Sequence, residues 1–384
     1  MHAGLMISFV GLGLPILAHC SILPHLALDK VLKDASPIFG PYMPSSVHTA
    51  HWMKRYPDST PVVRMNLPGT HDSATWNYSQ ATQDALRPIT DLNGESLQVS
   101  DWYRCQDRSL IDMLNAGIRV FDLRFAMDAT SSTLVFYHGA ALQSETATVE
   151  DVFFGFYHWL DHHPTEALFL SLKYEDGTAR NATNDISVQR AMYKILTSMP
   201  ARHYLNPMQN ELGTLGQARG KITLFRRFDM ADLPTEEVAH VPGLHFPPRL
   251  WTDNSPNIEL LYNKRKNFTA FIGDFYETGA GLGSSAALNI QWKLNATTSH
   301  LVKAATQHPD SLFWTFASSE YDTNVPPDYP RIMALGNGTQ KTPQGGANHQ
   351  LISFMQQHKG QRLGIVMFDF FDQPADLVAT LLDL

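Results

Sequence analysis

Two histidines of this chain stand directly after short apolar segments. His71 is followed at once by Asp72 in the stretch LPGTHDSAT, and His138 closes the segment TLVFYHG. The imidazole side chain is the one whose ordinary pKa lies near neutral pH, so it can take up or release a proton. Histidines accompanied by carboxylates and cations therefore indicate general acid–base chemistry around an anion.

Charged and polar side chains also close the other apolar segments. Arg124 in FDLRF is notable because a planar, permanently charged guanidinium suits a phosphate group. The segment ends hold no cysteine that could act as a nucleophile, and they hold no His-x-His or His-Glu-x-x-His spacing. We therefore predict neither a thiol nucleophile nor a metal centre there. The remaining end residues are Asp122, Lys173, Glu175, Arg227, Asp274, Tyr276, Ser318, Ser319 and Asp369.

Eight apolar segments must position these residues. Each is short, rich in β-branched and aromatic residues and bounded by Gly, Pro or polar clusters, which is typical of strands. Their near-continuous hydrophobicity favours parallel strands buried on both faces. Amphipathic helical patterns lie between them. The strands are expected at 61–71, 117–126, 133–139, 166–175, 220–228, 268–277, 311–319 and 363–371.

Eight strands with helical crossovers predict a single-domain α/β fold, a (β/α)8 TIM barrel. The barrel is expected to be distorted, because 139–149 offers a loop before its helix and 230–265 is Pro-rich and irregular. The C-terminal ends of barrel strands converge on one mouth, where such enzymes place their sites. We expect Pro68-Gly69 to form the turn that aims His71 into this mouth.

The composition is that of a globular protein, with 384 residues, 43% hydrophobic and 17% charged. A net charge of −8 without a Lys/Arg run argues against nucleic acid as a partner. The apolar run 5–18 predicts a signal peptide at 1–20, before a lead-in at 21–50 and the barrel domain at 51–384. No later segment is expected to span a membrane.

Five Asn-x-Ser/Thr sequons join the leader in predicting a secreted glycoprotein. Only Cys20 and Cys105 are present, so a disulfide framework is not expected. The sequons lie at Asn77, Asn181, Asn267, Asn295 and Asn337.

At this point the motifs carry a family resemblance. LPGTHDSAT, GIRVFDLRF, FYHGA and LFLSLKYE resemble the X-region of phosphatidylinositol-specific phospholipase C, in its bacterial, metal-independent branch. GKITLFRRF, GDFYE and RLGIVMFDFF extend the similarity, in order, over roughly residues 50 to 384. The resemblance implies cleavage of phosphatidylinositol, or of its glycosylated anchor form, to diacylglycerol and inositol 1,2-cyclic phosphate.

The resemblance also implies roles for the catalytic residues. His71 would be the general base that deprotonates the inositol 2-hydroxyl, and Asp369 would orient it. His138 would be the general acid for the departing diacylglycerol oxygen, with Asp72 as its partner. Arg124 would hold the phosphate.

Further residues match family positions that contact the inositol ring or support the phosphate site. Tyr276 would stack on the ring, and Arg227 rather than Arg226 is assigned by the family pattern. Glu175 is left out of this set, because pairing with Lys173 would explain it equally well. The implied substrate-binding residues are Lys173, Arg227, Asp274, Tyr276 and Asp122.

Arg124 also bears on the metal question. The calcium-dependent eukaryotic enzymes carry an extra carboxylate on the matching strand, whereas this chain has a cation there. A guanidinium and Ca²⁺ would compete for one electrostatic role. No metal and no other cofactor is therefore expected.

The expected partner is a phosphoinositide lipid at a membrane or micelle surface, acted on by a monomer. Two alternatives stay open. One is another phosphodiester-cleaving barrel, of the glycerophosphodiesterase or sphingomyelinase D type. The other is a non-catalytic barrel that binds phosphoinositides or glycans. The sequence does not separate phosphatidylinositol from its glycosylated or lyso forms, because all present the same reacting atoms.

Overall fold

The computed structural model describes residues 22–43, 45, 47–94, 96–277 and 279–383. The predicted signal peptide at 1–20 lies outside these residues. None of the helices in the described ranges combines the length and apolar character needed to cross a bilayer. Four predicted glycosylation asparagines are exposed and Asn337 is partly buried, while their modification stays a prediction. The exposed four are Asn77, Asn181, Asn267 and Asn295.

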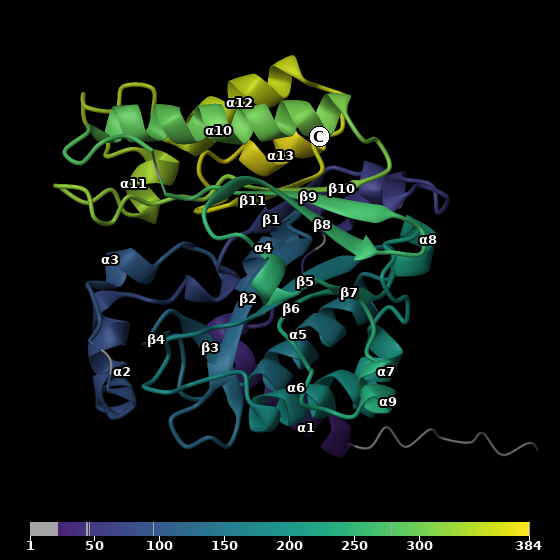
Figure 1. Ribbon diagram of the computed structural model, residues 1–384. Helices are drawn as coiled ribbons and strands as arrows, with labels where there is room; N and C mark the ends of the chain where they lie inside the picture. Colours follow the sequence, from purple (N-terminus) through teal and green to yellow (C-terminus); the bar gives the residue numbers. More distant parts are fainter. Residues whose placement is uncertain (1–21, 44, 46, 95, 278, 384) are drawn as a thin grey trace, which may run out of the picture.

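A mixed sheet of eleven strands forms the centre of the described molecule, in the order β7-β6-β5-β2-β1-β11-β10-β9-β8, with β3 paired to β2 and β4 paired to β3 (Figure 1). Eight of these strands, β7 through β9 in that order, pair in parallel. Across 22–277 and 279–383, no ladder joins β7 to β8, so the barrel stays open there. The predicted distorted barrel is confirmed. The strands are β1 Leu67–Thr70, β2 Val120–Met127, β3 Leu134–His138, β4 Ala141–Leu142, β5 Leu168–Tyr174, β6 Ile222–Arg227, β7 Leu244–His245, β8 Ser255–Asn263, β9 Phe268–Asp274, β10 Leu312–Phe316 and β11 Ile365–Phe368.

The identity of one barrel strand was wrong in the sequence prediction. The segment 133–139 forms β3, which returns antiparallel along β2. The short loop between β2 and β3 allows only this hairpin, because a parallel strand needs a crossover of a dozen or more residues. The remaining parallel strand is β7, two residues long and too short to show a pattern, within the stretch predicted to be irregular. His138 nevertheless comes back to the level of the mouth.

The turn predicted at Pro68-Gly69 is also wrong, because both residues lie inside β1. A Cβ on Gly69 would lie 2.4 Å from the sulfur of Met367 and 2.9 Å from Cβ of Val120. Glycine there allows close packing against the neighbouring strands. The chain instead turns at Asp72, which has a left-handed φ of 39°.

Helices cover the sheet on both sides, and those predicted from the sequence are present. In Figure 1, α10, α12 and α13 lie together at the top, whereas α1, α5 and α6 lie below the sheet. A capping box explains where α5 begins, because Thr148 accepts from the backbone N–H of Asp151 and Asp151 returns the contact. The helices are α1 Ile22–Phe39, α2 Gln80–Asn93, α3 Ser100–Tyr103, α4 Leu110–Ala116, α5 Val149–His162, α6 Ile186–Thr197, α7 Met199–Tyr204, α8 Leu215–Ala218, α9 Thr235–Val238, α10 Ala286–Thr306, α11 Pro330–Leu335, α12 Ala347–Gln357 and α13 Leu377–Leu382, with 3-10 turns η1 His48–Arg55, η2 Val62–Arg64, η3 Ser73–Thr75 and η4 Pro248–Leu250.

The lead-in segment contributes to the same core as the barrel. Ile38 and Phe39, at the end of α1, are completely buried, and Phe39 packs edge-on against Phe156 of α5. The buried ion pair between Arg119 and Glu166, 2.6 Å apart, fixes the start of β2 to the start of β5. The strand ends that carry the site are therefore held by a rigid frame.

Candidate active site

A pocket of about 330 Å³ opens at the C-terminal ends of the parallel strands. Eight of the ten predicted site residues line it, and the other two, Asp72 and Asp122, lie completely buried beside them. The structure therefore brings the whole predicted set together. The lining members of that set are His71, Arg124, His138, Lys173, Arg227, Asp274, Tyr276 and Asp369.

His71 and Asp369 come from the two ends of the chain and meet because β1 and β11 are neighbours in the sheet. Nδ1 of His71 lies 2.9 Å from Oδ1 of Asp369, which fixes the ring orientation. Gln106 ties the two strand ends together by donating to the carbonyls of His71 and Phe368. Burial would lower the pKa of His71, but the charge and hydrogen bond of Asp369 outweigh it and raise that pKa.

This raised pKa predicts the acid limb of the pH profile. A general base must be neutral, so activity should rise with pH through a His71 pKa above the ordinary value of about 6.5. In Asp369→Asn the negative charge is absent, and the acid limb should move to lower pH while the rate falls. The measurement is kcat/KM against pH for both proteins. An acid limb that stays in place would show that Asp369 does not act on His71.

Arg124 lies at the centre of the site, where its guanidinium faces three carboxyls and the base. Nη2 lies 2.6 Å from Nε2 of His71, and Nη1 lies 3.4 Å from Oε1 of Glu175. Nε lies 3.2 Å from Asp72 and 3.4 Å from Asp122. Because Arg124 only donates, Nε2 of His71 accepts, so Nδ1–H donates to Asp369. This is the tautomer that a general base requires.

The second histidine stands opposite the first. The His138 and His71 ring centroids are 6.2 Å apart. Nδ1 of His138 donates to the carbonyl oxygen of Tyr103 at 2.7 Å, and the predicted partner, Oδ2 of Asp72, is farther at 3.2 Å. Sequence reasoning missed Tyr103, because a backbone acceptor leaves no signal in residue types.

His138 is not the protonated member of this pair. Burial, reinforced by the charge of Arg124, lowers the pKa of His138 to about 3. Burial raises the pKa of Asp72 to about 7, although Arg124 and His71 oppose the shift. His138 is therefore neutral at neutral pH, with Nε2 free of a proton while Nδ1–H binds Tyr103.

Glu175 belongs to the site although it was left out of the predicted set. It binds Nζ of Lys173 at 2.7 Å and also accepts from the backbone N–H of Gly139 at 2.8 Å. Burial would raise the pKa of this carboxyl, but Lys173 and Arg124 hold it below its usual range. Glu175 thus connects the end of β5 with the loop that carries His138.

Arg227 closes the far wall, and Arg226 does not line the pocket. The guanidinium lies 3.8 Å from the ring centroid of Trp251 and 3.2 Å from Asp122. Trp251 donates to Oδ2 of Asp274 at 2.7 Å. Sequence reasoning missed Trp251, whose only signal was an aromatic residue in a Pro-rich stretch.

Tyr276 lies at the rim of this wall. Its hydroxyl donates to Oδ1 of Asp253 at 2.9 Å, which fixes the ring at the edge of the pocket. This position leaves the ring available for stacking.

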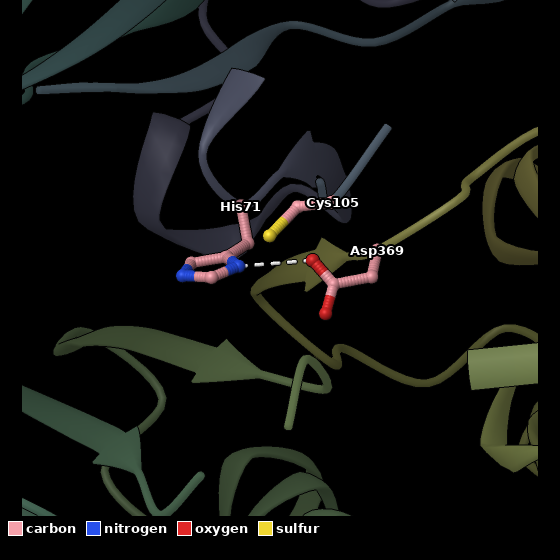
Figure 2. A group of neighbouring side chains, drawn as sticks. All are labelled: His71, Cys105 and Asp369. Atoms are coloured by element: carbon pink, nitrogen blue, oxygen red, sulfur yellow. Dashed lines mark hydrogen bonds and ion pairs between the residues drawn. The ribbon is translucent and has the colours of Figure 1, made fainter. Parts of the chain in front are cut away.

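No cysteine stands at a strand end, but Cys105, in the loop between α3 and α4, lies close to the reacting groups. Figure 2 shows the thiol of Cys105 beside His71 and Asp369, and the three ligand atoms lie within 4.8 Å of one another. Burial raises the pKa of Cys105 well above its usual value, so the thiol stays neutral and is a poor nucleophile. In the described ranges this is the one group of His, Cys, Asp or Glu side chains close enough to share a metal ion.

Lys293 supports the site from α10. Its ammonium group is 1% exposed and donates to the carbonyls of Phe275 at 2.7 Å and Phe316 at 2.8 Å, at the ends of β9 and β10. Burial lowers its pKa to about 7.

Replacing Lys293 by methionine should destabilise the protein by about 1–3 kcal/mol, because two buried carbonyls lose their donor. Urea unfolding measures this change. Lys303→Met, on the same helix but partly exposed, is the matched control and should cost about 1 kcal/mol or less. Equal stabilities for the two variants would contradict the assigned role of Lys293.

Comparison with known proteins agrees with this geometry. Residues 92–228 match the family model described as phosphatidylinositol-specific phospholipase C, X domain. The chain is 28% identical over 183 residues to a 1-phosphatidylinositol phosphodiesterase of Listeria monocytogenes, covering 47% of this chain and 49% of that protein. A protein of the same name from Staphylococcus aureus is 22% identical over 213 residues, covering 53% and 58%. The similarity thus spans about half the length of these curated relatives.

The fold comparison covers more of the chain. The solved structure of phosphatidylinositol-specific phospholipase C from Listeria monocytogenes superposes with a TM-score of 0.59 at 21% identity, over 88% of this chain and 98% of that one. This likeness shows the barrel fold. The sequence match shows that residues 92–228 are similar to the X domain of phosphatidylinositol-specific phospholipase C.

Proposed function

We propose that this protein is a phosphoric diester-cleaving enzyme that acts on phosphatidylinositol or its glycosylated form. The products are diacylglycerol and inositol 1,2-cyclic phosphate. The observation that carries the proposal is the junction of His71 and Arg124, where the accepting nitrogen of an oriented base lies 2.6 Å from a guanidinium. A substrate whose hydroxyl group lies next to a phosphate fits this junction, because the hydroxyl can meet Nε2 of His71 while the phosphate meets the guanidinium of Arg124.

In the first half of the reaction, the 2-hydroxyl of the inositol ring gives its proton to Nε2 of His71. Its oxygen then bonds to phosphorus within the same molecule. Asp369 stabilises the imidazolium that forms, as the carboxylate does in a catalytic triad. Arg124 compensates the charge on the phosphate oxygens. Because the attack is intramolecular, orientation and proton transfer supply most of what the protein must contribute.

In the second half, the bond between phosphorus and the glyceryl oxygen breaks, and that oxygen takes a proton from the His138–Asp72 pair. Burial and the charge of Arg124 keep the His138 ring neutral. The phosphodiester brings a negative charge next to His138, which favours its protonated form. Substrate binding thus favours uptake of a proton at Nε2 of His138, and the carboxyl of Asp72 beside Nδ1 stabilises the charged ring.

The ring-binding residues surround the place where the cyclitol would lie. Lys173, Arg227 and Asp274 offer a polar wall, and Tyr276 offers an aromatic face at the rim. Contacts with neighbouring side chains hold all four residues in place, so few side chains must be immobilised when the substrate binds. We expect this lipid to be met at a membrane or micelle surface.

A substrate panel tests the proposal against other phosphodiesterases. Phosphatidylinositol, sphingomyelin, phosphatidylcholine and a glycerophosphodiester are each incubated in mixed micelles with excess chelator or with Mg²⁺. Release of diacylglycerol from phosphatidylinositol in the presence of chelator is the expected result. Turnover restricted to another substrate, or turnover that Ca²⁺ or Mg²⁺ must restore, would overturn the assignment. Binding of phosphatidylinositol without turnover would instead favour a non-catalytic barrel.

A further inference from the structure

Two polar residues on the pocket wall are not used by the proposed chemistry. Ser319 and Glu320 follow β10 and both line the pocket. Ser319 is 4% exposed, and its hydroxyl has no hydrogen-bond partner among the described residues. Among the residues that the structure describes, none forms a hydrogen bond or ion pair with the carboxyl of Glu320. Both groups therefore have unsatisfied hydrogen-bonding capacity beside the pocket.

Three other carboxyls of the site differ in this respect. Asp369 pairs with His71, Asp274 accepts from Trp251, and Glu175 binds Lys173. Their capacity is used to position other side chains. A pocket-lining carboxyl without such a partner is more readily explained by a ligand that binds to it, since leaving a shielded polar group unpaired is costly.

The position of Glu320 indicates which part of a ligand it would meet. Its backbone N–H donates to the carbonyl of Tyr276 at 3.1 Å, so it lies level with the aromatic rim. The charges that act on its carboxyl are those of Asp322 of its own loop, His71 of the β1 end, Asp369 of the β11 end and Arg124 of β2. Glu320 is therefore placed between the ring-stacking residue and the base. Burial and Asp322 raise its pKa to about 7, so near neutral pH it can donate or accept.

We propose that Glu320, assisted by Ser319, contacts a free hydroxyl of the cyclitol ring beside the attacking hydroxyl and thereby determines headgroup specificity. This inference rests on the proposed function and names a further substrate-contacting residue of the same site. A hydroxyl satisfies both side chains. A phosphate at that ring position would bring further negative charge close to the two carboxyls of Glu320 and Asp369, which is unfavourable in a shielded pocket.

The experiment compares Glu320→Ala and Glu320→Gln with the wild-type protein. Steady-state kinetics on phosphatidylinositol give KM and kcat, and calorimetric titration with free myo-inositol gives a Kd that does not depend on turnover. Glu320→Ala should raise KM and Kd about tenfold or more, the usual effect of losing a hydrogen bond to a charged group. Glu320→Gln, which keeps a donor and an acceptor, should recover part of this loss.

Glu236→Gln is the control, since it removes an exposed carboxyl of α9 that does not line the pocket. It should change KM and Kd by no more than about twofold. Melting temperatures and near-UV spectra verify that each variant is folded.

A second readout addresses specificity, which a merely structural role would leave unchanged. The wild-type protein should prefer phosphatidylinositol to its 3-phosphate, and this preference should shrink at least tenfold in Glu320→Gln. Suppose the wild type cleaves phosphatidylinositol, but the Glu320 variants change neither KM and Kd nor the preference for phosphatidylinositol over its 3-phosphate. The inference is then overturned and the proposed function stands. If the wild type neither cleaves phosphatidylinositol nor binds inositol, both are overturned.

Discussion

Replacing His71 by alanine should lower kcat on phosphatidylinositol by roughly two to four orders of magnitude, the usual contribution of a positioned general base. Neither His138 nor Cys105 can take its place. His138 has a pKa of about 3 and binds Tyr103, and the thiol of Cys105 is kept protonated by burial. KM should change much less, because the ring-binding wall is formed by other residues.

The comparison needs a control that removes a histidine without touching the pocket. His349→Ala, an exposed position on α12, should retain near-full activity. Asp369→Asn should retain the fold but lose much of the rate, since it no longer stabilises the imidazolium. The pair His71→Ala and Asp369→Asn should be far from additive, because the two residues act as one unit. Near-full activity of His71→Ala would show that another group is the base.

Replacing Arg124 by lysine should cost about two to three orders of magnitude in kcat, although the charge is kept. The guanidinium spans Asp72, Asp122, Glu175 and His71 at once, and the single ammonium of lysine cannot reproduce this planar fork. The loss should appear in kcat more than in KM, because charge on the phosphate oxygens develops in the transition state.

Arg124→Met should be worse still and should also affect the fold. Two completely buried carboxyls, Asp72 and Asp122, would lose a counter-ion, and unpaired buried charge is strongly destabilising. Melting temperatures therefore accompany the kinetics. Arg226→Lys is the matched control, since it changes a neighbouring arginine on β6 that does not line the pocket. Equal activity of Arg124→Lys and the wild type would remove Arg124 from the phosphate site.

The sequence predicted which residues gather at the pocket better than it predicted the contacts that hold them there. Polar residues at the ends of parallel strands share one edge, so eight of the ten predicted residues could be placed at the pocket without knowing any distance. His71 and Asp369 meet across almost the whole chain for this reason alone. Strand alternation allowed only one of Arg226 and Arg227 to face the mouth, and the family pattern alone assigned Arg227.

Features that depend on tertiary contacts could not be predicted in this way. β3 was taken for a barrel strand because an apolar run looks the same in a hairpin and in a parallel sheet. Gly69 was interpreted as a turn residue, whereas close packing against Met367 explains it. Trp251 and Cys105 reach the site from segments without a periodic pattern. Such residues are recognised only once the loops are folded over the mouth.

The most direct test of the account is phosphorus NMR during the cleavage of phosphatidylinositol in micelles with excess chelator. The account predicts that the substrate signal falls while the resonance of inositol 1,2-cyclic phosphate rises as the first product. The same resonance should be absent with His71→Ala over the same time. A first product that is an acyclic inositol phosphate, or a phosphate that remains on the diacylglycerol, would contradict attack by the ring hydroxyl and with it the proposed roles of His71 and Arg124.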